Sequence, residues 1–185
     1  MDHPRPSVGP LWSFVFGNER PVEIEIGPGR GDVLLAFAAA RPDVNFLAIE
    51  HLPGTVERLT ARLEAAGITN ARVIGGDAPC VIGQLIPAAS VARYHIYFPD
   101  PWPKRRHHRR RLFTPDFVAA LARTLVPGGT VHVATDLGWL YETIDNTLTA
   151  GGFSRHADTP PPQRPTTRFE RKYAGAGTYA GSYGT

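Results

Sequence analysis

A short apolar stretch followed by a helical pattern occurs five times along this chain of 185 residues. The first stretch, Val22 to Ile26, alternates apolar and acidic residues and ends at Gly27, which predicts a strand entering a turn. The later strands are expected at Phe46–Ile49, Arg72–Ile74, Val91–Phe98 and Thr130–Ala134. The helices are expected at Asp32–Arg41, Pro53–Ala66, Val81–Ile86, Pro115–Leu125 and Leu137–Ala150.

Repeated strand–helix units predict an α/β, Rossmann-like fold, with a mostly parallel sheet and helices on both faces. Right-handed crossovers bring the carboxyl ends of the strands to one edge, where ligands of open α/β sheets bind. An acid falls at each of these five ends: Glu25, Glu50, Asp77, Asp100 and Asp136. A single acid can be a solvated loop residue or a helix cap, as Asp136 can be, but five together predict a ligand site.

The length supports one domain over residues 1–185, with 1–20 as a short N-terminal extension and 153–185 as a C-terminal segment. The single cysteine, Cys80, excludes an internal disulfide and gives no metal-ligand spacing, so no metal is expected. The first ten residues lack the apolar core of a signal peptide, and no apolar run is long enough to span a bilayer. We therefore expect a cytoplasmic protein that does not enter a membrane.

The turn after the first strand is rich in glycine, with Gly27, Gly29 and Gly31 at alternate positions. Glycines permit positive φ and a close approach of ligand to backbone, and the next helix offers free N–H groups. The spacing departs from that of dinucleotide-binding turns. Glu25 would repel a pyrophosphate but attract an amino or sulfonium group, and Glu50 falls where a ribose-binding acid is expected. The turn favours a nucleoside cofactor that carries an amino acid.

A proline-rich turn follows the fourth strand. Three prolines within Pro99–Pro103 fix the backbone, so that Asp100 and Trp102 are held in a defined pose. Trp102 is expected to pack within this turn. The next eight residues, 104–111, are all basic or imidazole and hold six of the 20 Lys and Arg residues. This density predicts a surface for a polyanion, and the alternative is a solvated basic loop.

On these residues the chain resembles the bacterial, single-chain tRNA (guanine-N7)-methyltransferases, which use S-adenosylmethionine on a class I Rossmann-like fold. The similarity extends from Phe16 to Tyr173. Its most specific segments are residues 98–111, 25–31, 76–78 and 167–170. Only about twenty residues precede the first strand, and the Gly- and Tyr-rich end, which can form a strand pair or fray, matches poorly.

The resemblance implies a role for each segment. Cofactor contacts are expected from Glu25, Gly27, Gly29, Gly31, Glu50, Asp77, Ala78 and Asp100, with Asp100 also catalytic. The substrate guanosine would be contacted by Lys104, Asp136, Thr167, Arg168, Phe169 and Glu170. The tRNA backbone would be contacted by Arg106, His107, His108, Arg109, Arg110 and Arg111.

The chemistry of guanine N7 defines what these residues must do. Its lone pair is available at neutral pH, so alignment matters more than a base. Asp100 can stabilise the positive charge that develops on the purine, or hold the methionine end of the cofactor. Asp136 and Glu170 are the acids available to accept hydrogen bonds from the guanine edge. Alternatively, Glu170 caps a helix or pairs with Arg168 or Arg171 within the tail.

Three other functions remain open from the sequence. An NAD-linked oxidoreductase is disfavoured by the glycine spacing, by Glu25 and by the basic run. A catalytically silent tRNA-binding subunit would not need acids at all five strand ends. A methyltransferase acting on another RNA or on a protein would share most of these features. The assembly is expected to be a monomer or a homodimer, with tRNA as the partner.

Overall fold

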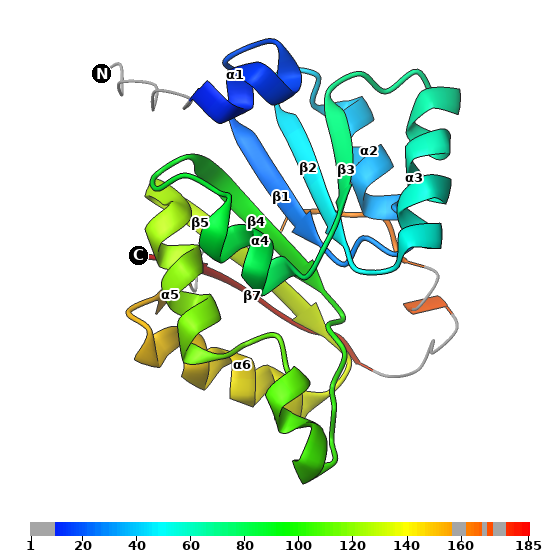
Figure 1. Cartoon of the computed structure of the whole chain (residues 1–185). Helices are drawn as coiled ribbons and strands as arrows, with labels where there is room; N and C mark the ends of the chain where they lie inside the picture. Colours follow the sequence, from blue (N-terminus) through cyan, green and yellow to red (C-terminus); the bar gives the residue numbers. More distant parts are fainter. Residues whose placement is uncertain (1–9, 157–161, 168–169, 172–176) are drawn as a thin grey trace.

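The computed structural model describes residues 10–156, 162–167, 170–171 and 177–185. It contains a seven-stranded sheet in the order β3-β2-β1-β4-β5-β7-β6 (Figure 1). The strands are β1 Val22–Ile26, β2 Asn45–Glu50, β3 Ala71–Gly75, β4 Val91–Tyr97, β5 Leu125–Thr135, β6 Ser154–Arg155 and β7 Tyr179–Gly184. The helices are α1 Pro10–Phe16, α2 Asp32–Ala40, α3 Pro53–Ala65, α4 Ala78–Gln84, the 3₁₀ helix η1 Arg105–Arg110, α5 Pro115–Thr124 and α6 Gly138–Ala150.

The expected Rossmann-like arrangement is confirmed. Strands β1 to β5 pair in parallel, and β7 runs antiparallel between β5 and β6. The chain moves outward from β1 to β3 and then returns to β4 on the other side of β1. The loops after β1 and β4 therefore diverge at the carboxyl edge, which is where open α/β sheets form a binding crevice.

Helices cover both faces of the sheet, because alternate strand residues point to opposite sides. Residues of α1, α4, α5 and α6 form one core with Ile24, Ile96 and Val133. Residues of α2 and α3 form a second core with Phe46 and Ala48. In Figure 1, α3 stands beside β3 and α6 lies below β5 and β7. None of the helices in the described ranges is long and apolar enough to cross a membrane.

The N-terminal segment contains a helix that the sequence analysis missed. Residues 1–20 were expected to be an extension, yet α1 contributes Trp12 and Phe16 to the core. Trp12 is only 1% exposed, and its indole N–H donates to the Ser90 carbonyl at 3.0 Å. Because α1 has only seven residues and a proline at its start, its pattern is too short to be recognised in the sequence.

Several boundaries differ from the expectations by one or two residues, and two elements begin more than two residues earlier than expected. Helix α4 begins at Ala78 rather than at Val81, since Asp77 accepts a hydrogen bond from the Cys80 N–H and starts the helix earlier. Strand β5 includes Leu125 and the Pro127–Gly129 turn. The register shifts there, because Leu125 pairs with Val91 before an irregularity, and regular pairing resumes when Thr130 meets Arg93.

The C-terminal end forms an interior strand of the sheet. Tyr179 pairs with Thr135 at one end of the β5–β7 ladder, and Gly184 pairs with Thr130 at the other end. Tyr183 is fully buried, and its hydroxyl donates to Asp145 of α6 at 2.7 Å. The strand is therefore held on both edges and against a helix, and it does not fray.

Candidate functional site

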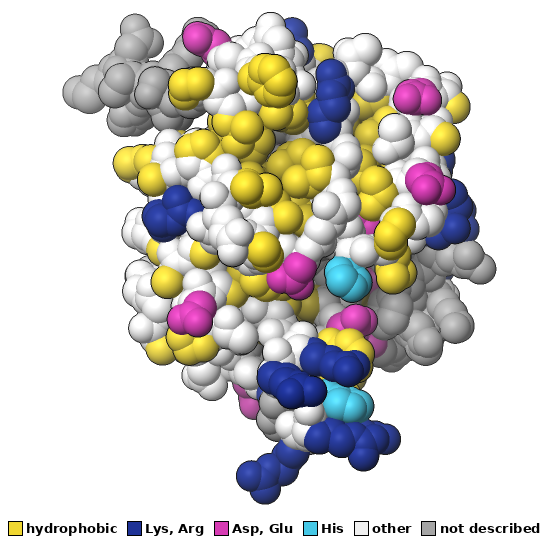
Figure 2. All heavy atoms as spheres, viewed as in Figure 1, with side chains coloured by type: hydrophobic (Ala, Val, Ile, Leu, Met, Phe, Trp, Pro, Cys, Tyr) yellow, Lys and Arg dark blue, Asp and Glu magenta, His cyan; other side chains and the backbone are white. Residues whose placement is uncertain are grey.

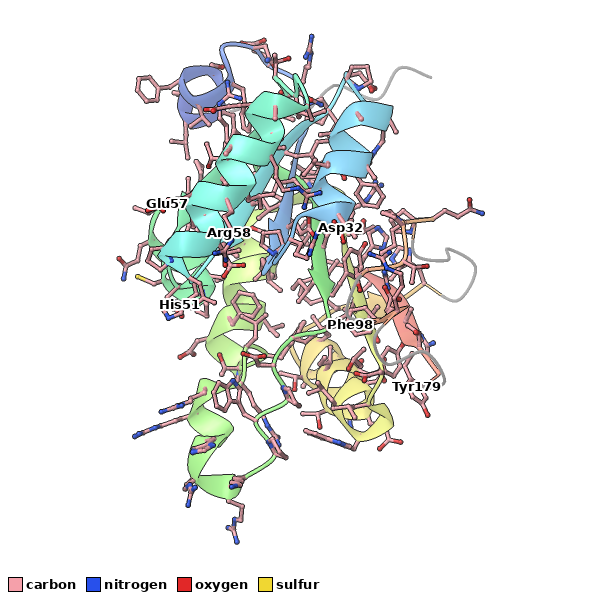
Figure 3. All side chains as sticks on the ribbon, turned by 90° about the vertical axis from the view of Figure 1, so that its right-hand side faces the viewer. Asp32, His51, Glu57, Arg58, Phe98 and Tyr179 are labelled. Atoms are coloured by element: carbon pink, nitrogen blue, oxygen red, sulfur yellow. The ribbon has the colours of Figure 1, made fainter. Side chains whose placement is uncertain are left out.

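A cavity of about 450 Å³ lies at the carboxyl ends of β1 and β4. Its walls come from the glycine-rich turn, the start of α2, the end of β4 and the C-terminal segment. In Figure 3, Asp32 at the start of α2 and Phe98 after β4 lie on the same side of the molecule, near the C-terminal segment. The lining residues are Glu25, Gly27, Pro28, Gly29, Arg30, Asp32, Val33, Tyr97, Phe98 and Thr167.

Glu25 is the acidic side chain buried in the wall of this cavity. It is 5% exposed, and its Oε2 has no hydrogen-bond partner among the described residues. Burial raises the pKa of its carboxyl to about 8, Asp32 adds to this effect, and Arg164 and the Leu34 N–H oppose it. A buried carboxylate oxygen without a donor is costly to maintain, so it marks a position that a cationic or donor group would stabilise.

The glycine-rich turn provides backbone rather than side chains to the cavity. Gly27, Gly29 and Gly31 all have positive φ, between 54° and 74°, which L-residues with side chains rarely adopt. A Cβ at Gly31 would also overlap the Leu59 side chain, so glycine is required there for α3 to pack. Both observations explain why glycine occupies these positions, and the turn therefore presents backbone to the cavity.

Glu50 fixes the shape of this turn from the end of β2. Its Oε2 accepts from the Gly29 N–H at 3.2 Å, and its Oε1 accepts from the Leu52 N–H at 3.0 Å. The side chain is 7% exposed. Glu50 therefore joins the β1–α2 turn to the β2–α3 turn, and each carboxylate oxygen keeps a second lone pair for a ligand.

Asp77 and Ala78 lie farther along the same edge. Asp77 is exposed and caps α4, whereas Ala78 is buried in the core beneath that helix. Neither is among the residues that line the cavity in the described part of the chain. The structure thus gives both a local structural function, and a cofactor contact from either stays a prediction.

The proline-rich turn after β4 carries two strained residues. Phe98 and Trp102 have φ of 53° and 38°, a conformation that is unfavourable for aromatic residues. The Phe98 N–H donates to the Ala134 carbonyl at 2.7 Å, which anchors the start of the turn to β5. Phe98 lines the cavity, and Asp100 follows it by two residues. Asp100 is exposed and borders a separate small hollow together with Leu112 and Leu140. Such strain at a defined turn is frequent at functional sites.

Trp102 was expected to pack within this turn, and its aromatic contacts in the described residues are with the basic run. The Arg110 guanidinium lies 5.0 Å from its ring centroid, and His107 meets it edge-on at 5.5 Å. The basic residues form the 3₁₀ helix η1 rather than a loop. Arg105, Arg106, Arg109 and Arg110 are exposed on it, as is Lys104 just before it.

This basic helix stands at the edge of the molecule. Figure 2 shows Lys and Arg side chains gathered at the lower end of the viewed face, where Figure 1 places the short helix after β4. Arg111 differs from the others, because it is half-buried and lies over the Trp139 ring at 5.1 Å. The side chain of His108 lies outside the described part, so its expected phosphate contact stays a prediction.

The C-terminal segment reaches the cavity through Thr167. The Thr167 N–H donates to Glu170 Oε2 at 2.7 Å, and the Glu170 N–H donates to Thr167 Oγ1 at 3.2 Å. This reciprocal pair is a capping box, which the Thr-x-x-Glu spacing could have predicted. Arg168 and Phe169, also expected to contact the substrate, lie outside the described residues.

Glu170 is engaged within this segment. Arg164 donates to both of its oxygens, at 2.7 and 2.9 Å. Burial acts to raise the pKa of the Glu170 carboxyl, but the hydrogen bonds from Arg164 and Thr167 outweigh it and lower that pKa. The alternative left open by the sequence, a capping and ion-pairing function, is what the structure shows, with Arg164 as the ion-pair partner among the described residues. Arg171 lies near Asp32 instead. No sequence signal had selected Arg164.

Asp136 follows β5 and is half-exposed. The capping function considered for it is not observed, because α6 has Leu137 at its N-cap and no side-chain cap. Just before the helix, Thr135 Oγ1 accepts from the Leu137 N–H at 3.3 Å. The carboxyl edge therefore brings Glu25, the glycine turn and Thr167 to one cavity. Glu50 lies behind that cavity, and Asp77, Asp100 and Asp136 are distributed along the rim.

The comparisons with known proteins agree with this geometry. A sequence model described as "putative methyltransferase" matches residues 19–180. A tRNA (guanine-N(7)-)-methyltransferase of Streptomyces coelicolor is 41% identical over 169 residues, covering 84% of this chain and 60% of that protein. The Bordetella pertussis protein of the same name is 42% identical, covering 85% of this chain and 63% of its own length. A third, from Nitrosomonas eutropha, is 41% identical and covers 85% and 72%.

Solved structures of methyltransferases share the fold at low identity. The 16S rRNA methyltransferase KamB has a TM-score of 0.67 and 16% identity, covering 92% of this chain and 90% of its own. The antibiotic-resistance methyltransferase Kmr has a TM-score of 0.63 and 19% identity, covering 94% and 90%. The chain spans only 60% to 63% of the first two relatives named above. On its identity to these relatives and the family match, the chain belongs to the tRNA (guanine-N7)-methyltransferase family.

Proposed function

We propose that this protein transfers a methyl group from S-adenosylmethionine to N7 of a guanosine in tRNA. One observation carries the proposal: the buried Glu25 carboxylate, with one oxygen unpartnered among the described residues, lies in the wall of the carboxyl-edge cavity. The ammonium group of a bound amino acid would supply the missing donors and charge. The names of the relatives, each of which is a tRNA (guanine-N(7)-)-methyltransferase, agree with it.

The cavity residues fit the cofactor in three respects. Glu25 suits the methionine ammonium, the backbone from Gly27 to Gly31 allows close approach, and Glu50 retains lone pairs for ribose hydroxyls. A dinucleotide is less suitable, because its pyrophosphate would bring neither a hydrogen-bond donor nor a positive charge to Glu25. We therefore assign cofactor binding to Glu25, Glu50 and the glycine turn, with Asp77 and Ala78 as further contacts along the edge.

Asp100 would act by alignment and charge. When bound, S-adenosylmethionine supplies an electrophilic methyl group, and guanine N7 already has a lone pair to accept it. No proton has to leave N7, so a base is not required. The purine becomes cationic as the methyl group arrives, and a carboxylate held between two prolines would stabilise that charge without reorganising. The fixed turn from Phe98 to Pro103 provides this rigidity.

The basic helix η1 is the surface that we assign to tRNA. Lys and Arg side chains gather at the lower end of the face in Figure 2, and η1 follows the Asp100 turn directly in the chain. Arginine and lysine side chains neutralise phosphates and release counterions, which gives affinity without reading sequence. Contacts to the guanosine itself would come from Lys104, Asp136 and the Thr167 region. Because the Glu170 carboxylate is engaged by Arg164, we assign the guanine edge first to Asp136.

The decisive experiment uses purified protein, unmodified tRNA transcripts and S-adenosylmethionine labelled in its methyl group. We expect one labelled nucleoside, 7-methylguanosine, in the nuclease digest. A label in another nucleoside or in protein would redirect the assignment to another methyltransferase activity. Cofactor and tRNA binding without any transfer would instead favour a silent tRNA-binding subunit. Since tRNA is the substrate proposed, we place the protein in the cytoplasm.

A further inference from the structure

Arg164 occupies the joint between the C-terminal segment and the aromatic wall of the cavity. Its guanidinium lies 4.6 Å from the Tyr97 ring centroid and 5.3 Å from that of Phe98. Both rings line the cavity, and the Arg164 side chain is 11% exposed. A guanidinium over aromatic rings in a partly buried site is held by cation–π attraction and by packing. Arg164 is thus fixed in place on one side by the end of β4.

The other side of Arg164 holds the C-terminal segment. Its two terminal nitrogens form a two-pronged ion pair with Glu170, whose carboxylate also accepts from the Thr167 N–H. Thr167 is a wall of the cavity. A continuous set of contacts therefore runs from the Tyr97 ring through Arg164 and Glu170 to Thr167. Figure 1 shows this segment, in orange, behind the sheet.

The Tyr97 ring is itself fixed from behind. Its hydroxyl lies 2.9 Å from His95 Nδ1, and His95 Nε2 lies 2.7 Å from Glu23 Oε2. Burial acts to raise the pKa of the Glu23 carboxyl, but His95, Arg93 and Arg41 together lower that pKa to about 2. An ionised Glu23 can only accept, so His95 Nε2 donates to it. Burial lowers the pKa of His95, which keeps its ring neutral, so Nδ1 accepts from the Tyr97 hydroxyl. The ring beneath Arg164 therefore has one orientation.

We propose that Arg164 is a positioning residue that fastens the C-terminal segment across the cavity, so that Thr167 completes the wall only while Arg164 is seated on Tyr97 and paired with Glu170. The inference rests on the proposed function, because the cavity is taken to hold S-adenosylmethionine. It assigns Glu170 a function in closing the cavity rather than in reading guanine. Losing this fastening should let the cofactor leave faster without changing the chemical step.

The test begins with Arg164→Met, which keeps length and apolar contact but removes the charge and the two-pronged pair. The matched control is Arg155→Met. Arg155 also lies over a tyrosine ring, 5.5 Å from the Tyr141 centroid, but it pairs with Tyr183, which lies opposite Val131 near the start of β5 and away from the cavity. In hydrogen exchange without cofactor, the Thr167 and Glu170 amides should exchange at least about tenfold faster in Arg164→Met only. Equal exchange in wild type and Arg164→Met would overturn the inference whether or not the protein binds a cofactor.

Cofactor binding provides the second readout. For Arg164→Met, the Kd for S-adenosylmethionine should rise about tenfold through a faster dissociation rate, and kcat at saturation should fall less than about threefold. Tyr97→Phe, which keeps the ring, should retain most of the affinity, and Tyr97→Leu should lose as much as Arg164→Met. A fall in kcat with unchanged Kd would assign Arg164 to the chemistry and overturn the inference.

A double-mutant cycle separates positioning from direct cofactor contact. If Arg164 acts through Glu170, then Arg164→Met and Glu170→Gln together should weaken binding no more than the stronger single change. If the losses of affinity in the two single variants added up in the double variant, Arg164 would contact the cofactor directly, and the proposed positioning function would be refuted. Absence of S-adenosylmethionine binding by the wild-type protein would count against the proposed function, while the exchange result would still decide the inference.

Discussion

Glu50 Oε2 accepts a hydrogen bond from the Gly29 N–H at 3.2 Å, which ties the end of β2 to the glycine turn after β1. The same carboxylate accepts from Leu52 at the start of the next helical segment. One side chain therefore sets the relative position of the two turns that border the proposed cofactor site. A ligand that contacts both turns therefore depends on Glu50 for their relative position, in addition to any direct contact with its carboxylate.

The first prediction concerns Glu50→Ala. It removes an acceptor of two backbone N–H groups, and hydrogen bonds to a charged group contribute roughly 1.5–3 kcal/mol each. We expect S-adenosylmethionine affinity to fall at least about tenfold, with a lower melting temperature. Calorimetry and thermal unfolding measure both, and Glu64→Ala, an exposed acid of α3, is the control. Unchanged affinity would remove Glu50 from the site.

The second prediction uses the pKa of Glu25, which burial raises from 4.5 to about 8. The unliganded protein therefore holds a proton on Glu25 at pH 7, and an ammonium group placed beside it should expel that proton. Binding of S-adenosylmethionine at pH 7 should therefore release most of one proton. Calorimetry in buffers of different ionisation enthalpy measures this number. Glu25→Gln should bind more weakly and release none, whereas Glu64→Gln should match wild type.

The third prediction applies the same shift to stability. Because the folded pKa of Glu25 lies above its unfolded value, its contribution to stability is intact below pH 4.5 and is lost as the pH rises through about 8. Relative to wild type, Glu25→Gln without cofactor should therefore gain stability between pH 5 and pH 9. Denaturant unfolding at several pH values tests it. A constant difference between the two proteins across that range would contradict the assigned burial effect.

The fourth prediction separates the arginines of the basic run. Arg105, Arg106, Arg109 and Arg110 are exposed, so each alanine substitution should lower the slope of log affinity for tRNA against log salt by roughly one unit. Arg111 lies over Trp139, so Arg111→Ala should lower stability and change the slope little. Filter binding at several salt concentrations measures the slope. If all four exposed substitutions together left it unchanged, η1 would be only a solvated helix.

Much of the fold was predictable because it depends on local patterns. The period-two alternation predicts strand β1, and a proline at the first position predicts the start of α5. The glycines after β1 predict a turn. The acids at the strand ends were predictable for the same reason, since topology fixes which ends meet. Their individual partners were not, because Glu50 meets Gly29 across 21 positions and Asp77 turned out to cap α4.

The closing side of the cavity could not be derived from the sequence. Arg164 lies 67 positions after Tyr97, and nothing in either residue predicts that they touch. The contact of Glu23 with His95 was equally hidden, because the sequence identified their two segments only as strands and did not pair these residues. Such contacts depend on which strands become neighbours and on how a tail crosses them. Helix α1 was missed because its seven residues give too short a pattern, and the hydrogen-bond partner of Trp12, Ser90, lies 78 positions away.

The fifth prediction tests that helix with two aromatic residues two positions apart. Trp12 is 1% exposed and donates to the Ser90 carbonyl at 3.0 Å, whereas Phe14 is 88% exposed. Trp12→Ala should lower the free energy of unfolding by roughly 3–5 kcal/mol, because it leaves a cavity and an unpaired carbonyl. Phe14→Ala should change it by less than about 0.5 kcal/mol. Trp12→Phe, which keeps most of the volume but loses the indole N–H, should fall between them. Denaturant unfolding gives all three values, and an equal loss for Trp12→Ala and Phe14→Ala would show that α1 does not pack on the sheet in solution.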